Sequence, residues 1–241
     1  GGAKLKKADL TRAKLKKAIL KSANLKDAKL IRADLTNAEL NYAVLDNANL
    51  RNSKLKKANL NDAKLKGANL INAKLKKATL VNASLKKAKL RRSDLTKANL
   101  TNADLKRADF SSSNLEEANL YKASLISAKL RKANLTNAYL KNADLKRANL
   151  SSANLNGANL SNTNFFSADL TRANLSNADL TASNLINSDL SYSNLKNAKL
   201  SKANLSGANL YGLSETKLAS CPELLPIGWA CNSENYLQKI R

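Results

Sequence analysis

The sequence of 241 residues contains no histidine and no methionine, and it has only seven glycines, two prolines, two cysteines, one tryptophan and three phenylalanines. Histidine is the commonest general base and the usual activator of a nucleophile, so its absence argues against the common acid–base and nucleophilic sites. No glycine-rich phosphate-binding loop is present. No stretch approaches 18 apolar residues, and the sequence therefore predicts no transmembrane segment.

Acidic residues are also scarce, with 18 Asp and Glu against 42 Lys and Arg and a net charge of +24. The excess is uneven, because residues 1–110 carry 28 basic and nine acidic residues, and residues 111–241 carry 14 and nine. The adjacent acids Glu116 and Glu117 are interpreted as a solvated pair. We therefore expect a protein that is not an enzyme, without catalytic residues, cofactor or metal ligands.

The dominant feature present is a repeat of five residues. Leucine or phenylalanine occupies every fifth position from Leu5 to Leu210, in 42 consecutive pentapeptides, with phenylalanine only at Phe110 and Phe165. The residue two places earlier is small: Ala in 35 repeats, Ser in six and Thr163 in one. The residue just before each Leu is Asn in 17 repeats and Asp in nine, and both types tolerate turn conformations. We expect these residues to form corners.

A period of five fits neither a helix nor a flat strand. Five residues advance about 500° around a helix, and an odd step places alternate residues on opposite faces of a strand. The pattern indicates instead a solenoid of stacked coils that keeps every Leu on one axis. Replacements of the small Ala recur at multiples of 20, as in Ser53, Ser93 and Ser113, and this spacing favours four repeats per coil.

The strings Ala8-Asp9-Leu10-Thr11-Arg12 and Ala173-Asn174-Leu175-Ser176-Asn177 follow the pattern A(D/N)LXX. Over residues 3–210 this pattern resembles the pentapeptide repeat proteins. The resemblance implies an all-β fold, a right-handed quadrilateral β-helix with four pentapeptides per coil and about 10.5 coils, hence a rod roughly 50 Å long at strand spacing. It implies that all leucines from Leu5 to Leu210 are buried. We expect such a convex rod to offer no pocket.

The repeat stops after Leu210. Residues 211–241 hold both prolines, both cysteines and the tryptophan, and we predict two units: a β-helix over 1–210 and a C-terminal cap over 211–241. Its short tetrapeptide Pro226–Trp229 resembles tails of cyanobacterial family members. Gly1-Gly2 is interpreted as a cloning remnant or a processing point, so that a leader or N-terminal cap would be missing. The apolar residues expected to cover the last coil are Leu213, Leu218, Leu224, Leu225, Ile227 and Trp229.

Cys221 and Cys231 are the only cysteines, and their spacing matches no zinc motif or CxxC redox motif. The best interpretation is a disulfide that staples the cap. A disulfide would imply an oxidising compartment such as a periplasm or thylakoid lumen, and without it we expect a cytoplasmic protein.

If one coil is 20 residues long, basic residues stack in two outward columns. Like charges about 4.8 Å apart repel, and bound anions would relieve that repulsion. The alternative is that lysines protect the open edge of the first coil and keep the protein soluble. The candidate anion-facing residues are Lys6, Lys26, Lys66, Lys86, Lys106 and Lys146, a series interrupted by Asp46 and Ile126, and Arg12, Arg32, Arg92, Lys132 and Arg172.

These features predict a non-catalytic rod, a structural or interaction scaffold with a basic surface for an acidic protein or other anionic partner. The alternative is non-specific binding of nucleic acid or of an anionic membrane surface. For nucleic acid, aromatic residues that could stack on bases are sparse and scattered on the outside: Tyr42, Tyr121, Tyr139 and Tyr192. Some members of the family imitate duplex DNA and modulate DNA gyrase, but that requires an acidic rod, and the charge rejects it. A monomer or an end-to-end dimer, a purely structural role and an engineered scaffold are left open.

Overall fold

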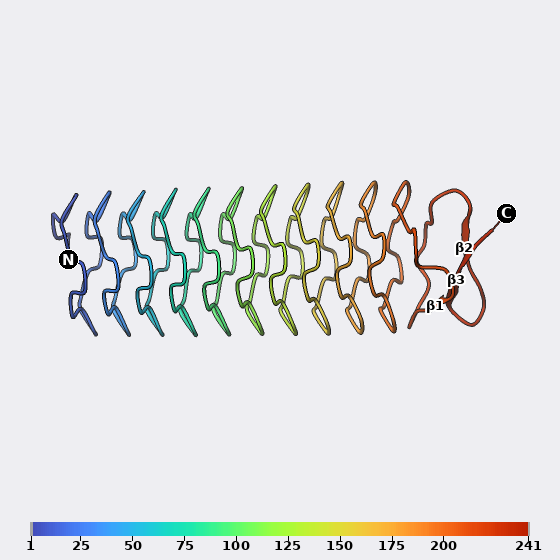
Figure 1. The fold of residues 1–241 in the computed structure, drawn as a ribbon, viewed down its shortest axis with the longest axis horizontal. Helices are drawn as coiled ribbons and strands as arrows, with labels where there is room; N and C mark the ends of the chain where they lie inside the picture. Colours follow the sequence, from blue (N-terminus) through green and yellow to red (C-terminus); the bar gives the residue numbers. More distant parts are fainter. Residues whose placement is uncertain (1, 241) are drawn as a thin grey trace.

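The computed structural model describes residues 2–240 and shows one elongated rod (Figure 1). Gly1, half of the Gly1-Gly2 pair discussed above, lies outside the described residues. Stacked coils run from the N-terminal end to about residue 210, and the chain then folds into a small sheet at the C-terminal end (Figure 1). Residues 2–240 contain no α-helix.

The coils are held together by parallel bridges between residues 20 apart, such as Lys4 with Asn24 and Asn49 with Asn69. Twenty residues are four pentapeptides, so each coil contains four repeats. Backbone hydrogen bonds join neighbouring coils beside these bridges, as where the Leu45 N–H donates to the Lys64 carbonyl at 2.6 Å. The predicted all-β fold of stacked pentapeptide coils is confirmed.

Each repeat turns the chain at the two residues that follow the leucine. In the first repeat the Ala8 N–H donates to the Leu5 carbonyl at 3.1 Å, and Lys7 between them has φ 60°. The second outward residue has positive φ in every repeat, and this is the pattern of a type II turn. The left-handed backbone conformation therefore lies two residues after Leu. The expectation that the Asn or Asp before Leu adopts the turn conformation was wrong.

Those Asn and Asp residues support the turn through their side chains instead. All 26 of them accept, through Oδ1, the backbone N–H two residues ahead; Asp9 accepts from Thr11 at 3.0 Å, for example. The side chain thus satisfies an amide that points outward at the corner. These hydrogen bonds explain the preference for Asn and Asp before Leu better than a need for a strained backbone conformation does.

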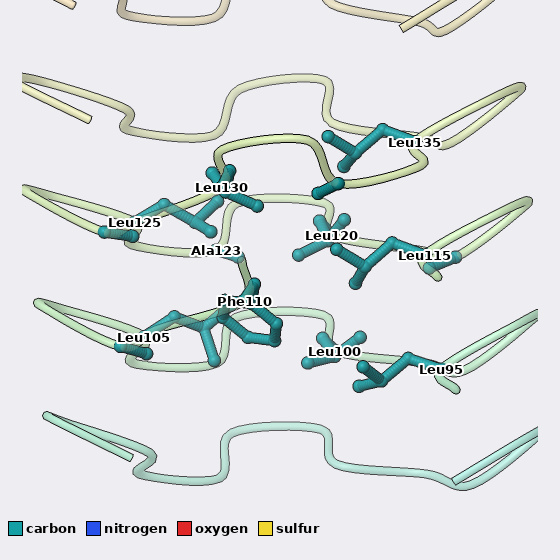
Figure 2. Close-up of a cluster of buried hydrophobic side chains, with 14 of the residues drawn as sticks. Leu95, Leu100, Leu105, Phe110, Leu115, Leu120, Ala123, Leu125, Leu130 and Leu135 are labelled. Carbon is teal, nitrogen blue, oxygen red and sulfur yellow. The ribbon is translucent and has the colours of Figure 1, made fainter. Parts of the chain in front are cut away.

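Leucine and the small residue face inward and fill the rod (Figure 2). Phe110 and Phe165 are fully buried among the leucines, and Leu20 to Leu210 are at most 7% exposed wherever Leu occupies the fifth position. Leu5, Leu10 and Leu15 are only partly buried, contrary to expectation. They belong to the first coil, which is covered on one side only.

The C-terminal segment forms an antiparallel sheet in the order β1-β3-β2, from β1 (Thr216–Lys217), β2 (Trp229–Cys231) and β3 (Tyr236–Lys239). Leu213 and Leu218, which lie on either side of β1, and Leu237 of β3 are buried in the core. The chain also pairs with the last coil, since Ser220 bridges to Lys199. The division into residues 1–210 and 211–241 therefore stays a prediction.

Two residues expected to cover the last coil do not do so. Leu224 is 48% exposed and Ile227 is fully exposed. Leu237 is buried instead, because β3 is the central strand of the sheet and turns this side chain toward the rod. A disulfide joins Cys221 to Cys231, with the Cα atoms 6.0 Å apart, and it links the chain before β2 to the end of β2.

Candidate anion-binding surface

The predicted basic residues stand on two separate edges of the rod. One series occupies the first outward position of its turns and the other the second, the position of positive φ. All of these side chains are exposed. We call the first series the Lys6 column, which comprises Lys6, Lys26, Lys66, Lys86, Lys106 and Lys146, and the second the Arg12 column, which comprises Arg12, Arg32, Arg92, Lys132 and Arg172.

Few of the cations have a carboxylate partner. Among residues 2–240, four ion pairs lie within 4.0 Å, and two of them involve the Lys6 column: Lys86 with Asp104 at 3.1 Å and Lys146 with Asp144 at 4.0 Å. The Arg12 column takes part in none of the four. Neighbouring carboxylates therefore leave most of the positive charge uncompensated.

The acidic residues on the outer faces are engaged in the turns. The Thr36 hydroxyl donates to Asp34 Oδ1 at 2.6 Å, and the Thr36 N–H donates to the same oxygen at 3.0 Å. These two hydrogen bonds lower the pKa of Asp34 below its ordinary value of 3.8. Of the two adjacent acids, Glu117 pairs with Lys97 at 3.1 Å.

A groove of about 840 Å³ runs beside the Lys6 column and overturns the expectation of a surface without a pocket. Its floor contains Ile126 and Ser127, whose short side chains separate two pairs of longer cations. We call it the basic groove. Its lining residues are Lys86, Lys87, Lys106, Arg107, Ile126, Ser127, Lys146, Arg147, Asn164, Phe166 and Asn184.

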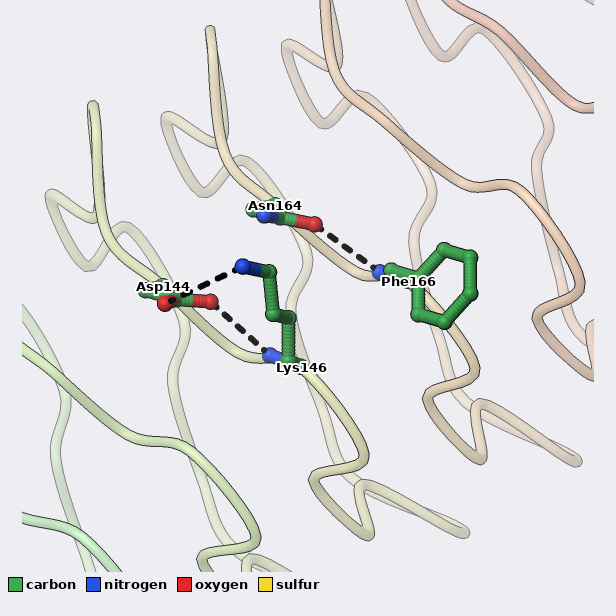
Figure 3. Close-up of polar contacts among 4 residues, drawn as sticks. All are labelled: Asp144, Lys146, Asn164 and Phe166. Carbon is green, nitrogen blue, oxygen red and sulfur yellow. Dashed lines mark hydrogen bonds and ion pairs between the residues drawn. The ribbon is translucent and has the colours of Figure 1, made fainter.

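Two local contacts shape this groove (Figure 3). The Lys146 side chain turns toward Asp144, while the Phe166 N–H donates to Asn164 Oδ1 at 3.1 Å. The Phe166 ring points away from Asn164 and is partly exposed (Figure 3). An aromatic side chain thus lies one coil beyond Lys146 in the same column.

Sequence reasoning found three of the groove cations, Lys86, Lys106 and Lys146, and missed Lys87, Arg107 and Arg147. The signal was present, since each missed residue directly follows a predicted one in the sequence. A column links residues 20 apart along the rod and does not include the neighbour across the turn. Ile126 was noted only as an interruption.

A second groove, of about 390 Å³, lies on the edge of the Arg12 column. Two serines, Ser111 and Ser112, form its floor between cationic coils, and Asp109 lies at its side. We call it the arginine groove. Its cations are Arg91, Arg92, Lys129, Arg131 and Lys132.

The outward tyrosines are less scattered than predicted. Tyr121 stacks with Tyr139 at a centroid distance of 5.9 Å, and Tyr192 meets Tyr211 edge to face at 5.2 Å. Each pair joins residues close to one coil apart, which proximity in the sequence does not reveal. The paired rings are less available for stacking on a nucleic acid base.

Residues 2–240 bring together no three His, Cys, Asp or Glu side chains that could hold a metal ion. The same residues include no helix with the length and apolarity of a membrane span.

Two family models match the sequence. The first, described as pentapeptide repeats (8 copies), matches residues 103–142, 143–181 and 178–212. The second, described as a pentapeptide repeat region, matches residues 8–85 and 45–120. A search of curated proteins returned no match.

Similar solved structures include HetL, a pentapeptide repeat protein involved in heterocyst differentiation regulation from the cyanobacterium Nostoc sp. strain PCC 7120. It is 34% identical over 88% of this chain and 90% of its own, with a TM-score of 0.49. QnrB1, a plasmid-mediated fluoroquinolone resistance protein, is 19% identical over 72% and 86%, with a TM-score of 0.48. A protein of the Arabidopsis thaliana thylakoid lumen is 26% identical over 48% and 64%, with a TM-score of 0.28.

Proposed function

The chain belongs to the pentapeptide repeat family, and we propose that it is a non-catalytic rod, a scaffold that presents its basic surface to an acidic protein or another anionic partner. The observation that carries this proposal is the uncompensated charge. Most cations have no carboxylate within 4.0 Å among residues 2–240, and two grooves are lined mainly by Lys and Arg.

The grooves favour binding over chemistry. Their lining combines cations with Asn, Ser, Ile and Phe, and the one carboxylate, Asp109, accepts hydrogen bonds from the N–H and hydroxyl of Ser111 at 3.0 and 2.6 Å. A positively charged surface attracts a dense anion over a distance set by the ionic strength. The rigid coils would hold the cations at fixed spacing along the rod.

Two other classes of partner are less well supported. Non-specific binding of nucleic acid relies on charge and on free aromatic faces, but Tyr121 pairs with Tyr139 and Tyr192 pairs with Tyr211. An anionic membrane surface needs only charge, and it is kept as the alternative. Imitation of duplex DNA is rejected, since a rod of net charge +24 has the wrong sign.

The disulfide supports an inference about the cellular compartment of the protein. A bond between Cys221 and Cys231 persists most readily in an oxidising environment, and this supports a periplasm or thylakoid lumen over the cytoplasm. An acidic protein or membrane surface of that compartment would then be the partner.

Retention of the full chain on heparin and on anionic liposomes, measured against salt, tests the proposal. Replacing Lys66, Lys86 and Lys106 by Gln should weaken retention, and retention should collapse as the Debye length falls from about 10 Å at 0.1 M to about 3 Å at 1 M salt.

The matched control replaces Lys196, Lys199 and Lys202 by Gln. These lysines are also exposed, and their loss changes the net charge equally, but they lie outside both grooves. An equal loss of retention in the two variants would show that the Lys6 column contributes only through the net charge of the protein. Absence of retention at low salt would overturn the proposal.

A further inference from the structure

We propose that the basic groove takes an acidic polypeptide segment that carries one bulky apolar side chain, which packs between Ile126 and Phe166 while its carboxylates meet the surrounding cations. This inference rests on the proposed function and specifies the chemistry of the partner. It depends on Ile126, the apolar residue that interrupts the Lys6 column and lines the basic groove.

The apolar floor is the first observation. Ile126 and Phe166 stand in the same column, two coils apart, so their backbones are separated by about 10 Å. Both side chains are partly exposed, and both line the groove. Lys146 lies between them in the chain order of the column, and its side chain turns toward Asp144, with Nζ 4.0 Å from Oδ2 (Figure 3).

The cationic rim is the second observation. The coil before Ile126 carries Lys106 and Arg107, and the coil after it carries Lys146 and Arg147. In the described chain, the charged side-chain groups of Lys106, Arg107 and Arg147 have no carboxylate oxygen within 4.0 Å. These charges therefore face an apolar floor from both sides, and a ligand must supply carboxylates around an apolar centre to match both.

The arginine groove can be compared with the basic groove, because it is also lined by cations but differs in the residues of its floor. It has five cations and the same arrangement of a short-chain coil between longer ones, but its floor is Ser111 and Ser112. It offers nothing for an apolar side chain to contact. The preference for an apolar group should accordingly be absent from the arginine groove.

A protein segment fits this lining better than a nucleic acid does. Stacking of successive bases requires several aromatic faces, and the groove contains one aromatic ring, Phe166, beside an aliphatic residue. Ile126 has no π face to offer a base. An aliphatic or aromatic side chain of a peptide can contact both residues at once.

The test uses two synthetic peptides that alternate Glu and Ser and differ only in a central Leu or a central Ser. Binding to the full chain is measured by fluorescence anisotropy at low salt. We expect the Leu peptide to bind about tenfold more tightly, less than complete burial of a leucine would give. Ile126→Ser and Phe166→Ser should each reduce that preference severalfold. Val81→Ser, which removes a partly buried aliphatic side chain on another column, should leave it unchanged.

Each outcome is informative once thermal unfolding shows that the variants fold. Equal affinity for the two peptides would overturn this inference and leave the proposed function standing. A preference that survives both Ile126→Ser and Phe166→Ser would overturn the assignment to this groove. Binding of neither peptide would overturn the inference, and heparin retention would then decide the proposed function separately. A single-stranded DNA oligonucleotide that bound more tightly than the Leu peptide and depended on Phe166 would also overturn it.

Discussion

The side chain of Asn47 occupies the space that a Cβ atom on Gly67 would need. A Cβ built on Gly67 would lie 2.6 Å from Asn47 Oδ1, and Gly67 itself has φ 69°. Asn137 stands over Gly157 and Asn187 over Gly207 in the same way. In these pairs glycine relieves both the left-handed conformation and the crowding from the coil before it.

Gly67→Ala should destabilise the rod by about 1–2 kcal/mol, since Ala adds left-handed strain and a contact with Asn47. Chemical denaturation measures the change. The double variant Asn47→Ala/Gly67→Ala should recover the stability that is lost to crowding, but not the stability that is lost to backbone strain. Unchanged stability in Gly67→Ala would show that the coil adapts to a methyl group.

Ser183→Ala should raise the free energy of unfolding by about 1 kcal/mol. The Ser183 hydroxyl is buried and has no hydrogen-bond partner, so its removal relieves a desolvation penalty. Ser53 is the matched control, because its hydroxyl donates to the Leu50 carbonyl at 2.7 Å and Ser53→Ala should be neutral or destabilising by about 0.5–1.5 kcal/mol. Equal effects at the two sites would contradict this account of the small position.

Asp34 should titrate below its ordinary pKa of 3.8, because the Thr36 hydroxyl and N–H stabilise its ionised form. A carboxylate whose pKa is lower in the folded state stabilises the fold above its unfolded pKa, and the contribution disappears as the pH falls through the folded value. NMR titration of the Asp34 carboxyl measures the shift. Thr36→Val, which keeps the N–H and removes the hydroxyl, should bring the pKa back toward 3.8; an unchanged pKa would refute the cause.

Cys221→Ser should destabilise the C-terminal sheet by about 2–3 kcal/mol, as expected for a short closed loop. Hydrogen exchange in β2 and β3 should rise, while exchange in the central coils stays slow. Non-reducing mass spectrometry of protein from its native compartment should show the loss of two hydrogens. Two thiols that alkylate freely would instead remove the argument for an oxidising location.

The predicted fold came from one physical constraint. A leucine at every fifth position can share one axis only if the chain turns by the same angle in each repeat, and burial of each side chain is worth about 1.5–3 kcal/mol. The pattern therefore predicted which residues face inward and, through recurrences such as Ser93 and Ser113, which residues stack. Its failures lie at the ends, where Leu5 has one neighbouring coil and not two.

The surface was harder to predict because outward positions carry no such constraint. The column of Lys86 and Lys106 followed from the period, but the groove beside it depends on side-chain lengths across the turn, on Ile126 and on the way Lys146 turns toward Asp144. The partner of the basic surface accordingly stays a proposal.

The sequence by itself determined the stacked coils, their inward and outward positions and the excess of positive charge, because a strict local period propagates into a regular structure. Only the tertiary structure decided which turn residue becomes left-handed, why the Asn and Asp side chains are there, and that Leu237 rather than Ile227 is buried. The first two depend on hydrogen bonds between residues two or three apart within turns of the stacked coils, and the burial of Leu237 depends on contacts between strands of the final sheet. The repeat determines contacts of that kind inside the rod, but it ends before residues 211–241 and does not determine them there.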